Sequence, residues 1–219
     1  MRKHPQIDSP FLLGVEDLPR KPDHSVAWEE IFSRQYPLRV EVGVGNSPFL
    51  IEVARHEPTF NYLGFEYSGK RVLKFLKKVD ASGLENIRMM RVNAVSALPQ
   101  AIEDGQLDHI FINFPDPWPK RRHAKKRFVQ GGVIQVLTRL LRAGGGISLR
   151  TDVAYYAEQM IEVLEGCQCL VNTTGPRNFA AEPRYTFPTT YEVKFRTEGR
   201  RIHYLEYNKV DTDQLDAAG

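Results

Sequence analysis

From residue 39 onward, short runs rich in β-branched residues alternate with segments that have the periodicity of an amphipathic helix. We expect strands at residues 39–44, 62–66, 87–92, 107–114 and 146–151, and the later helices at 128–142 and 153–165. Parallel strands need long crossover connections, which are usually helices, so this alternation predicts a parallel sheet with helices on both faces.

The C-terminal part of the chain has a different pattern. Residues 191–196 and 202–207 alternate around a Glu198-Gly199 turn, as the two strands of an antiparallel hairpin do. The expected fold class is therefore α/β, with a mostly parallel twisted sheet, helices on both faces and a C-terminal antiparallel hairpin. This topology resembles the Rossmann-like fold of class I methyltransferases, although periodicity alone also fits other doubly wound sheets.

The length of 219 residues fits one domain with a single core, which we place at residues 31–210. Residues 1–30 have the pattern of an irregular arm, and residues 211–219 that of an acidic, disordered tail. No apolar run approaches the roughly 20 residues of a membrane helix, and the N-terminus lacks a signal-peptide pattern. Cys167 and Cys169 have the alternate spacing of a strand, which does not favour a disulfide between them, so we expect a reducing, cytoplasmic setting.

Polar residues and glycines follow three of the expected strands. In open parallel sheets, ligands bind beyond the carboxyl ends of the strands. Glu41 and Gly43 stand at the end of the first strand, Glu66 at the end of the second and Asn93 at the end of the third. The glycine allows close approach of the backbone, Glu41 can attract a cationic amino-acid group, Glu66 can bind a ribose diol, and Asn93 can pair with adenine. These residues predict a cofactor that contains adenosine.

Two further features bear on the ligand. Pro48 occupies the position of the third glycine of a dinucleotide fingerprint, which disfavours a pyrophosphate. The helix expected after the second strand carries cations on its outer positions, which we interpret as a solvated face, with contact to RNA as the alternative. These cations are Lys70, Arg71, Lys74, Lys77 and Lys78.

The segment 113–120, with the sequence NFPDPWPK, joins a proline-rich turn to a cationic run. Its three prolines fix φ and remove backbone donors, so Asp116 and Trp118 stand on a stiff loop. Residues 120–127 include six Lys or Arg, although the net charge of the whole chain is only +3. Clustered cations bind phosphates with release of counterions, which predicts a nucleic-acid partner. We expect contacts to the RNA backbone from Arg122, Lys125, Lys126 and Arg127.

Over residues 38–208 the chain resembles the bacterial tRNA (guanine-N7-)-methyltransferases. The most specific motif is PDPWPK at 115–120, which continues through Arg122-His123 and the basic triplet 125–127. The second motif is TTYE at 189–192, and the third is LRTD at 149–152. The resemblance implies a reaction in which S-adenosylmethionine methylates N7 of a guanine in the variable loop of tRNA. We expect no metal ion and no membrane partner, and the oligomeric state stays open between a monomer and a homodimer.

The resemblance also assigns roles to individual residues. Contacts to the methyl donor would come from Glu41, Glu66, Asn93 and Asp116, and contacts to the target guanosine from Lys120, Asp152, Thr189, Thr190, Tyr191 and Glu192. Guanine N7 has a free lone pair, so no proton has to be removed and alignment dominates catalysis. We hypothesise that Asp116 is the catalytic residue, because its carboxylate accepts hydrogen bonds that strengthen as positive charge develops on the purine.

Two departures from the family and three alternatives remain. Many relatives have Asp at the position of Asn93, and the segment after Gly45 is usually more acidic or glycine-rich than the NSP found at 46–48. The alternatives are an NAD-dependent oxidoreductase, a methyltransferase directed at an exocyclic amino group, and an RNA-binding module without activity. The third alternative, an RNA-binding module, would give no function to Glu41, Glu66 and Asn93.

Overall fold

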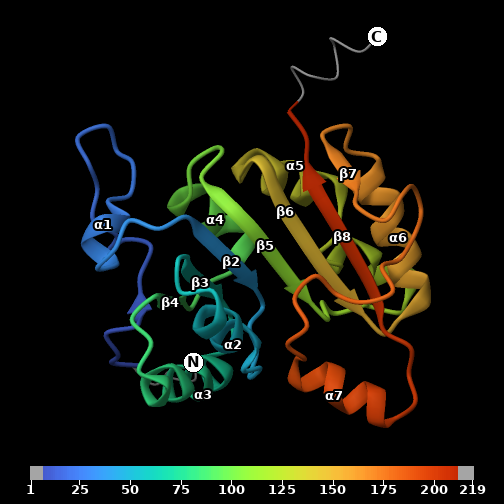
Figure 1. The fold of residues 1–219 in the computed structure, drawn as a ribbon, viewed down its shortest axis with the longest axis horizontal. Coiled ribbons are helices and arrows are strands. Elements are labelled where there is room, and N and C mark those ends of the chain that lie inside the picture. Colours follow the sequence, from blue (N-terminus) through green and yellow to red (C-terminus); the bar gives the residue numbers. More distant parts are fainter. Residues whose placement is uncertain (1–6, 212–219) are drawn as a thin grey trace. The chain divides into compact units, whose positions relative to one another are not determined.

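A computed structural model describes residues 7–211, which divide into two compact units. The first unit contains residues 7–103 together with Phe187–Thr190, and the second contains Asp104–Thr186 together with residues 191–211. Figure 1 shows the chain coloured along its sequence. The prediction of one domain over residues 31–210 stays a prediction, because compactness alone does not decide whether the units fold separately.

The first unit is built on four parallel strands in the order β1-β4-β3-β2. The strands are β1 (Leu12–Leu13), β2 (Leu38–Val42), β3 (Asn61–Phe65) and β4 (Ile87–Met90). Every residue of β2 and β3 is buried, including the charged residues Arg39 and Glu41 of β2, so both faces of these central parallel strands are covered.

Four helices belong to the first unit: α1 (Trp28–Ile31), α2 (Phe49–His56), α3 (Gly69–Ser82) and α4 (Ala94–Ala101). In α3 the apolar residues recur every three or four positions, so Val72, Phe75, Leu76 and Val79 form one buried stripe. Gly83 ends this helix with a φ of 67°, a left-handed conformation that glycine adopts at little cost.

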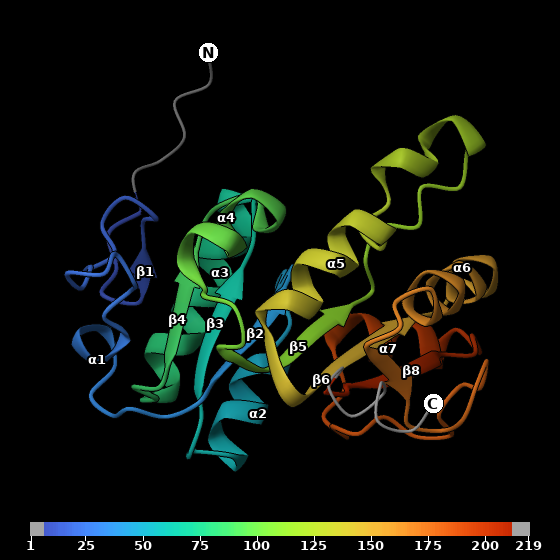
Figure 2. The same cartoon turned by 90° about the horizontal axis from the view of Figure 1, so that it is seen from above.

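The second unit has four strands in the order β5-β6-β8-β7. These are β5 (Leu107–Asn113), β6 (Leu141–Thr151), β7 (Leu170–Asn172) and β8 (His203–Lys209). β5 and β6 are parallel, whereas β8 runs antiparallel to both β6 and β7. The helical elements are η1 (Arg121–Lys126), α5 (Gly131–Leu140), α6 (Ala154–Glu165) and α7 (Thr190–Thr197). Helices α5 and α6 pack on each other and against β6 (Figure 2).

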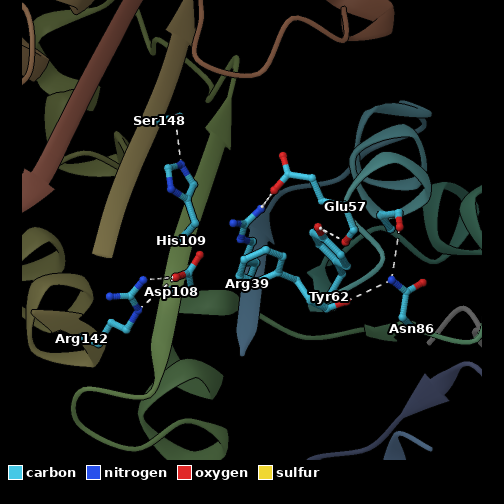
Figure 3. A network of polar contacts seen from close by, with 10 residues as sticks. Arg39, Glu57, Tyr62, Asn86, Asp108, His109, Arg142 and Ser148 are labelled. Atoms are coloured by element: carbon cyan, nitrogen blue, oxygen red, sulfur yellow. Dashed lines mark hydrogen bonds and ion pairs between the residues drawn. The ribbon is translucent and has the colours of Figure 1, made fainter. Parts of the chain in front are cut away.

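Figure 3 shows several hydrogen bonds that buried polar groups form within each unit. In the second unit, His109 Nε2 lies 2.7 Å from Ser148 Oγ, and Arg142 Nε donates to Asp108 at 2.9 Å. In the first unit, the hydroxyl of Tyr62 donates to the carbonyl of Glu57 at 3.0 Å. These bonds offset the cost of burying polar groups next to the central strands.

The expected fold class is confirmed, but one of its strands is wrong. Residues 191–196 lie in helix α7, and the antiparallel partners of β8 are β6 and β7. The helix places Glu192 and Arg196 one turn apart, where their side chains form an ion pair at 3.0 Å. It also stacks Tyr191 on Phe195. The period-two alternation of this segment predicted a strand. The side chains instead contact one another across one helical turn, and no strand pairing forms within the described residues.

The N-terminal arm is less irregular than expected. Leu12 pairs with Met89 and Leu13 with Met90, so residues 12–13 add a short parallel strand beside β4. A single bridge between Arg20 and Val26 closes the loop before α1. Residues 1–6, and all of the expected tail except Asp211, lie outside the described residues. Within the described residues, no helix has the length and apolar character needed to cross a membrane.

Candidate functional site

The loop after β2 and the end of β3 form the first part of the candidate site. Gly43 and Gly45 have φ values of 78° and 59°, which a residue with a side chain adopts only with strain. Glu66 is 7% exposed, and its two carboxylate oxygens accept hydrogen bonds from Gly45 N at 3.1 Å and Ser68 N at 2.7 Å. The carboxylate is therefore held rigidly beside the glycine loop. Each of its oxygens has a second lone pair that could accept a hydroxyl of a ligand.

The surroundings of this loop fit an adenosyl ligand. A Cβ added to Gly43 would meet no atom within 4 Å, so the exposed backbone there is open to close approach. Among the residues that the structure describes, Asn46 Oδ1 is buried without a hydrogen-bond partner, and such an acceptor gains free energy when a ligand donor reaches it. The carbonyl of Asn46 is already occupied, because it accepts a hydrogen bond from Lys78 Nζ at 2.6 Å.

Two other predicted cofactor residues lie in the same unit. Glu41 is a buried residue of β2, only 1% exposed. Asn93 is exposed, but it does not close a strand, because β4 ends at Met90 and Asn93 instead caps helix α4. Its side-chain oxygen accepts a hydrogen bond from Val95 N at 3.0 Å, an N-capping contact. This cap fixes the carboxamide three residues beyond the end of β4, whereas the sequence predicted that Asn93 itself ends the strand.

The TTYE segment reaches the glycine loop through its backbone. Ser47 Oγ accepts hydrogen bonds from Phe49 N at 3.2 Å and from Thr190 N at 3.3 Å. Thr189 is buried and Thr190 is exposed. The first unit therefore contains four of the predicted cofactor residues and two of the predicted substrate residues, namely Glu41, Gly43, Glu66, Asn93, Thr189 and Thr190.

In the second unit, the proline-rich loop after β5 presents Asp116 to solvent. Phe114 and Trp118, on either side of Asp116, have positive φ values of 50° and 40°. This conformation costs free energy for residues with a side chain, so surrounding contacts must enforce it. Arg127 supplies two of these contacts, since its guanidinium donates to the carbonyls of Pro117 at 2.9 Å and Trp118 at 3.3 Å.

The side chain of Trp118 packs against η1, the basic segment that follows the proline-rich loop. Its ring meets the imidazole of His123 edge-on, with 5.6 Å between centroids. Lys126 Nζ lies 4.9 Å from the ring centroid, a cation–π geometry. These contacts stabilise the junction between the loop and η1. They indicate that the ring of Trp118 holds the loop in place rather than offering a free face on which a base could stack.

The cations of the basic run have different environments. Arg122, Lys125 and Lys126 are exposed, as the prediction of phosphate contacts requires. Lys120, for which we predicted a contact to the target guanosine, is exposed as well. Arg127 is half-buried, and besides the two loop carbonyls it also bonds Gln159. Arg127 therefore stabilises the proline-rich loop, a role that was not predicted from the sequence.

Asp152, at the end of β6, is held by an exposed arginine. Arg200 Nη1 donates to Asp152 Oδ2 at 2.7 Å, and Arg200 Nε donates to Glu198 at 3.0 Å. The same guanidinium lies 4.7 Å from the ring centroid of Phe195 on α7. Asp152 is therefore oriented by Arg200, which lies outside the three sequence motifs. Its carboxylate remains mostly shielded from solvent.

Helix α7 is anchored by a buried ionic cluster. Glu192 is 1% exposed and accepts hydrogen bonds from Arg150 Nη1 at 2.6 Å and from the Tyr204 hydroxyl at 2.6 Å. Arg196 forms an ion pair with the same carboxylate at 3.0 Å, and Arg150 also bonds the carbonyl of Tyr185. Arg150, likewise 1% exposed, is another residue that sequence reasoning missed. An arginine inside an apolar strand is the signal that could have revealed it.

Tyr191 differs from its neighbour Glu192, because its ring is 43% exposed. It stacks on Phe195, with 5.8 Å between centroids, and the ring of Phe114 lies 6.2 Å from it. The second unit thus brings together Asp116 and most of the predicted substrate and RNA residues, namely Lys120, Asp152, Tyr191, Glu192, Arg122, Lys125, Lys126 and Arg127.

Comparisons with known proteins agree on the family to which this chain belongs. A family model with the description "Putative methyltransferase" matches residues 35–205. The tRNA (guanine-N(7)-)-methyltransferase of Xanthomonas campestris pv. campestris is 39% identical over 181 residues, which cover 83% of this chain and 69% of that protein. The resemblance seen in the sequence motifs is thereby confirmed.

Solved structures agree on the fold. The crystal structure of the 16S rRNA methyltransferase KamB superposes with a TM-score of 0.60 at 13% identity, covering 88% of this chain and 95% of that one. An S-adenosylmethionine-dependent O-methyltransferase of Thermotoga maritima gives a TM-score of 0.52 at 15% identity, covering 87% of this chain and 66% of that one. At such low identities these likenesses show the fold alone, which is that of class I methyltransferases.

Proposed function

This chain belongs to the tRNA (guanine-N(7)-)-methyltransferase family, and from that premise we propose that it methylates N7 of a guanine in the variable loop of tRNA. The observation that carries the proposal is the pairing of two features. A glycine loop is bonded to the buried carboxylate of Glu66, and a stiffened loop carries the exposed Asp116 ahead of a cationic run. The first suits an adenosyl group, and the second suits an RNA substrate.

S-adenosylmethionine, when bound, supplies a methyl group on a sulfonium, from which it can leave without acid catalysis. Glu66 would bind the ribose hydroxyls through its remaining lone pairs, and Asn93 would bind the adenine. The backbone at Gly43 would lie against the amino-acid part, with Glu41 attracting its ammonium group. Each assignment rests on the chemistry of the side chain and on its position at the end of a strand.

Asp116 is the residue that we assign to catalysis. Guanine N7 attacks through a neutral lone pair, so the protein needs to align the base rather than to deprotonate it. As positive charge develops on the purine, a fixed carboxylate stabilises it more strongly than it stabilises the neutral base. The contacts of Arg127 with the loop carbonyls keep the backbone beside Asp116 from relaxing. Lys120, Asp152 and Tyr191 would position the guanosine.

The RNA partner would be held by the exposed cations Arg122, Lys125 and Lys126. A base that takes part in tertiary contacts must be displaced before its N7 is accessible, and phosphate contacts hold the RNA during that step. We also propose a cytoplasmic location, because tRNA is found there and both cysteines are free thiols.

The proposal is tested by incubating the protein with methyl-labelled donor and unmodified tRNA, followed by nucleoside analysis. We expect the label in 7-methylguanosine, and we expect it to vanish when the variable-loop guanine of the transcript is replaced by adenine. Label in an exocyclic amino group would instead support the alternative methyltransferase. Binding of NAD but not of S-adenosylmethionine, measured by calorimetry, would support the oxidoreductase.

A further inference from the structure

Helix α3 in the first unit carries a row of cations on the side opposite its buried stripe. Lys70, Arg71, Lys74 and Lys77 are exposed, and we call these four residues the α3 basic face. Lys70 and Lys74 are one turn apart, as are Lys74 and Lys77, so their charges follow the helix in a line. Tyr67, directly before the helix, is 77% exposed. Aromatic rings next to clustered cations are typical of surfaces that bind nucleic acid.

The cations of this face differ from other exposed helical cations in their partners. On α2, Arg55 pairs with Glu52 at 2.7 Å, and on α5, Arg139 pairs with Asp104 at 2.9 Å. Within residues 7–211, by contrast, Lys70, Lys74 and Lys77 form no ion pair with a carboxylate. Like charges one turn apart destabilise a helix. A face that only needs to be solvated would gain stability from acidic residues at these positions.

Arg71 of the α3 basic face, and Lys78 on the same helix, connect α3 to the candidate cofactor site. Arg71 lies 3.7 Å from Glu66, the carboxylate beside the glycine loop. Lys78, half-buried, donates to the carbonyl of Asn46 in that loop. Burial, and secondarily the charge of Lys74, lowers the pKa of Lys78. The repulsion between Lys74 and Lys78 is thus part of the native structure, and an anion bound on this face would relieve it.

We propose that the α3 basic face is a second tRNA-binding surface, which contacts the phosphate backbone and is separate in sequence from the basic run at 120–127. Successive lysines are three or four residues apart, which is about 4.5–6 Å along the helix axis, so the row can follow the phosphates of a single strand. The surface rests on the proposed function for the identity of its partner. Through Arg71 and Lys78 it places the phosphates of the substrate next to the glycine loop.

The test compares two triple variants of the full chain that remove the same charge. The first is Lys70→Ala, Lys74→Ala and Lys77→Ala. The control is Lys21→Ala, Arg55→Ala and Arg139→Ala, three exposed cations that already form ion pairs. Binding of unmodified tRNA is measured at several salt concentrations, together with kcat and KM for methylation. Thermal unfolding shows whether each variant is folded.

We expect the α3 variant to bind tRNA at least tenfold more weakly than wild type and to lower the slope of log K against log salt by about 2, since each phosphate contact contributes about 0.7–0.9. We expect kcat at saturating tRNA to change by less than about twofold, and the control to match wild type. A slope of the α3 variant equal to that of the control would overturn the proposal. If wild type binds tRNA without methylating it, the proposed function fails while the slope comparison still decides on the α3 basic face.

Discussion

The hydroxyl oxygen of Ser47 accepts a hydrogen bond from the backbone N–H of Thr190 at 3.3 Å, across 143 residues of sequence. This bond fastens the start of the TTYE segment to the glycine loop, both within the first unit. Ser47 is buried, and its hydroxyl oxygen also accepts a hydrogen bond from Phe49 N at the start of α2. One side chain therefore fixes two backbone segments next to the predicted cofactor residues.

We predict that Ser47→Ala lowers the free energy of unfolding by about 1 kcal/mol, the usual cost of losing a partly buried hydrogen bond. The affinity for S-adenosylmethionine should fall as well, because the loop loses one of its fixed points. Chemical denaturation and calorimetry measure the two effects. Ser82→Ala is the matched control, since the hydroxyl of Ser82 bonds only the backbone at the end of α3, at Val79 O and Leu84 N, and it should leave the affinity for the donor unchanged.

The ionic cluster under α7 gives a second prediction. Removing one partner from a buried ion pair leaves an uncompensated charge, which costs about 3–5 kcal/mol. We expect Arg150→Met and Glu192→Gln each to destabilise the fold strongly, and the double variant to cost less than the sum of the two. Urea denaturation of the four proteins gives the coupling energy.

The same experiment tests the role that the family resemblance gives to Glu192. With 1% exposure and bonds to Arg150 and Tyr204, this carboxylate is better placed to hold α7 than to contact a guanosine. If Glu192→Gln keeps wild-type stability and only raises KM for tRNA, then Glu192 contacts the substrate instead.

A third prediction separates Arg127 from its basic neighbours. Arg122 and Lys125 are exposed, so Arg122→Ala and Lys125→Ala should each lower the salt slope of tRNA binding by about one. Arg127→Ala should instead lower kcat with little change in the slope, because it releases the carbonyls of Pro117 and Trp118. Single-turnover rates and binding at several salt concentrations distinguish the two patterns. A loss of slope without a loss of rate for Arg127→Ala would make it a phosphate ligand like the others.

These contacts show where sequence reasoning succeeds and where it does not. The central strands were predicted to within a few residues because short segments with valine, leucine and aromatic residues alternate with segments of helical periodicity, a pattern that is local in the sequence. Helix α7 was missed because the burial of Glu192 depends on Arg150, which lies 42 residues away. The role of Arg127 could not be predicted either, since it depends on the carbonyls of Pro117 and Trp118, which come within its reach only in the folded loop.

A fourth prediction concerns pH and the buried Glu206 on β8. Burial raises the pKa of this carboxyl group, and hydrogen bonds from Ser148 and from Arg184 N offset the shift only in part. A pKa that is higher in the folded state than in the unfolded state contributes stability that is complete below the unfolded value and is lost as pH rises through the folded value. The stability of wild type relative to Glu206→Gln should therefore fall as the pH rises above the ordinary pKa of a glutamate and through the raised pKa of the folded state. Denaturation at several pH values measures it, and a difference that grows with pH would contradict the assignment.

The last prediction concerns Asp116, the residue that we place in the chemistry. With donor and tRNA both saturating, Asp116→Asn and Asp116→Ala should lower the single-turnover rate by on the order of 10²-fold, the range found when a preorganised electrostatic contact is removed. Asn keeps the size of the side chain but loses the charge, so a similar loss in both variants would identify the carboxylate rather than its shape. Asp104→Asn, which neutralises an exposed aspartate of the same unit, should retain the wild-type rate. Rates of both Asp116 variants within about threefold of wild type, a difference of ~0.65 kcal/mol in the barrier, would remove Asp116 from the mechanism and leave alignment of the guanine as the main source of catalysis.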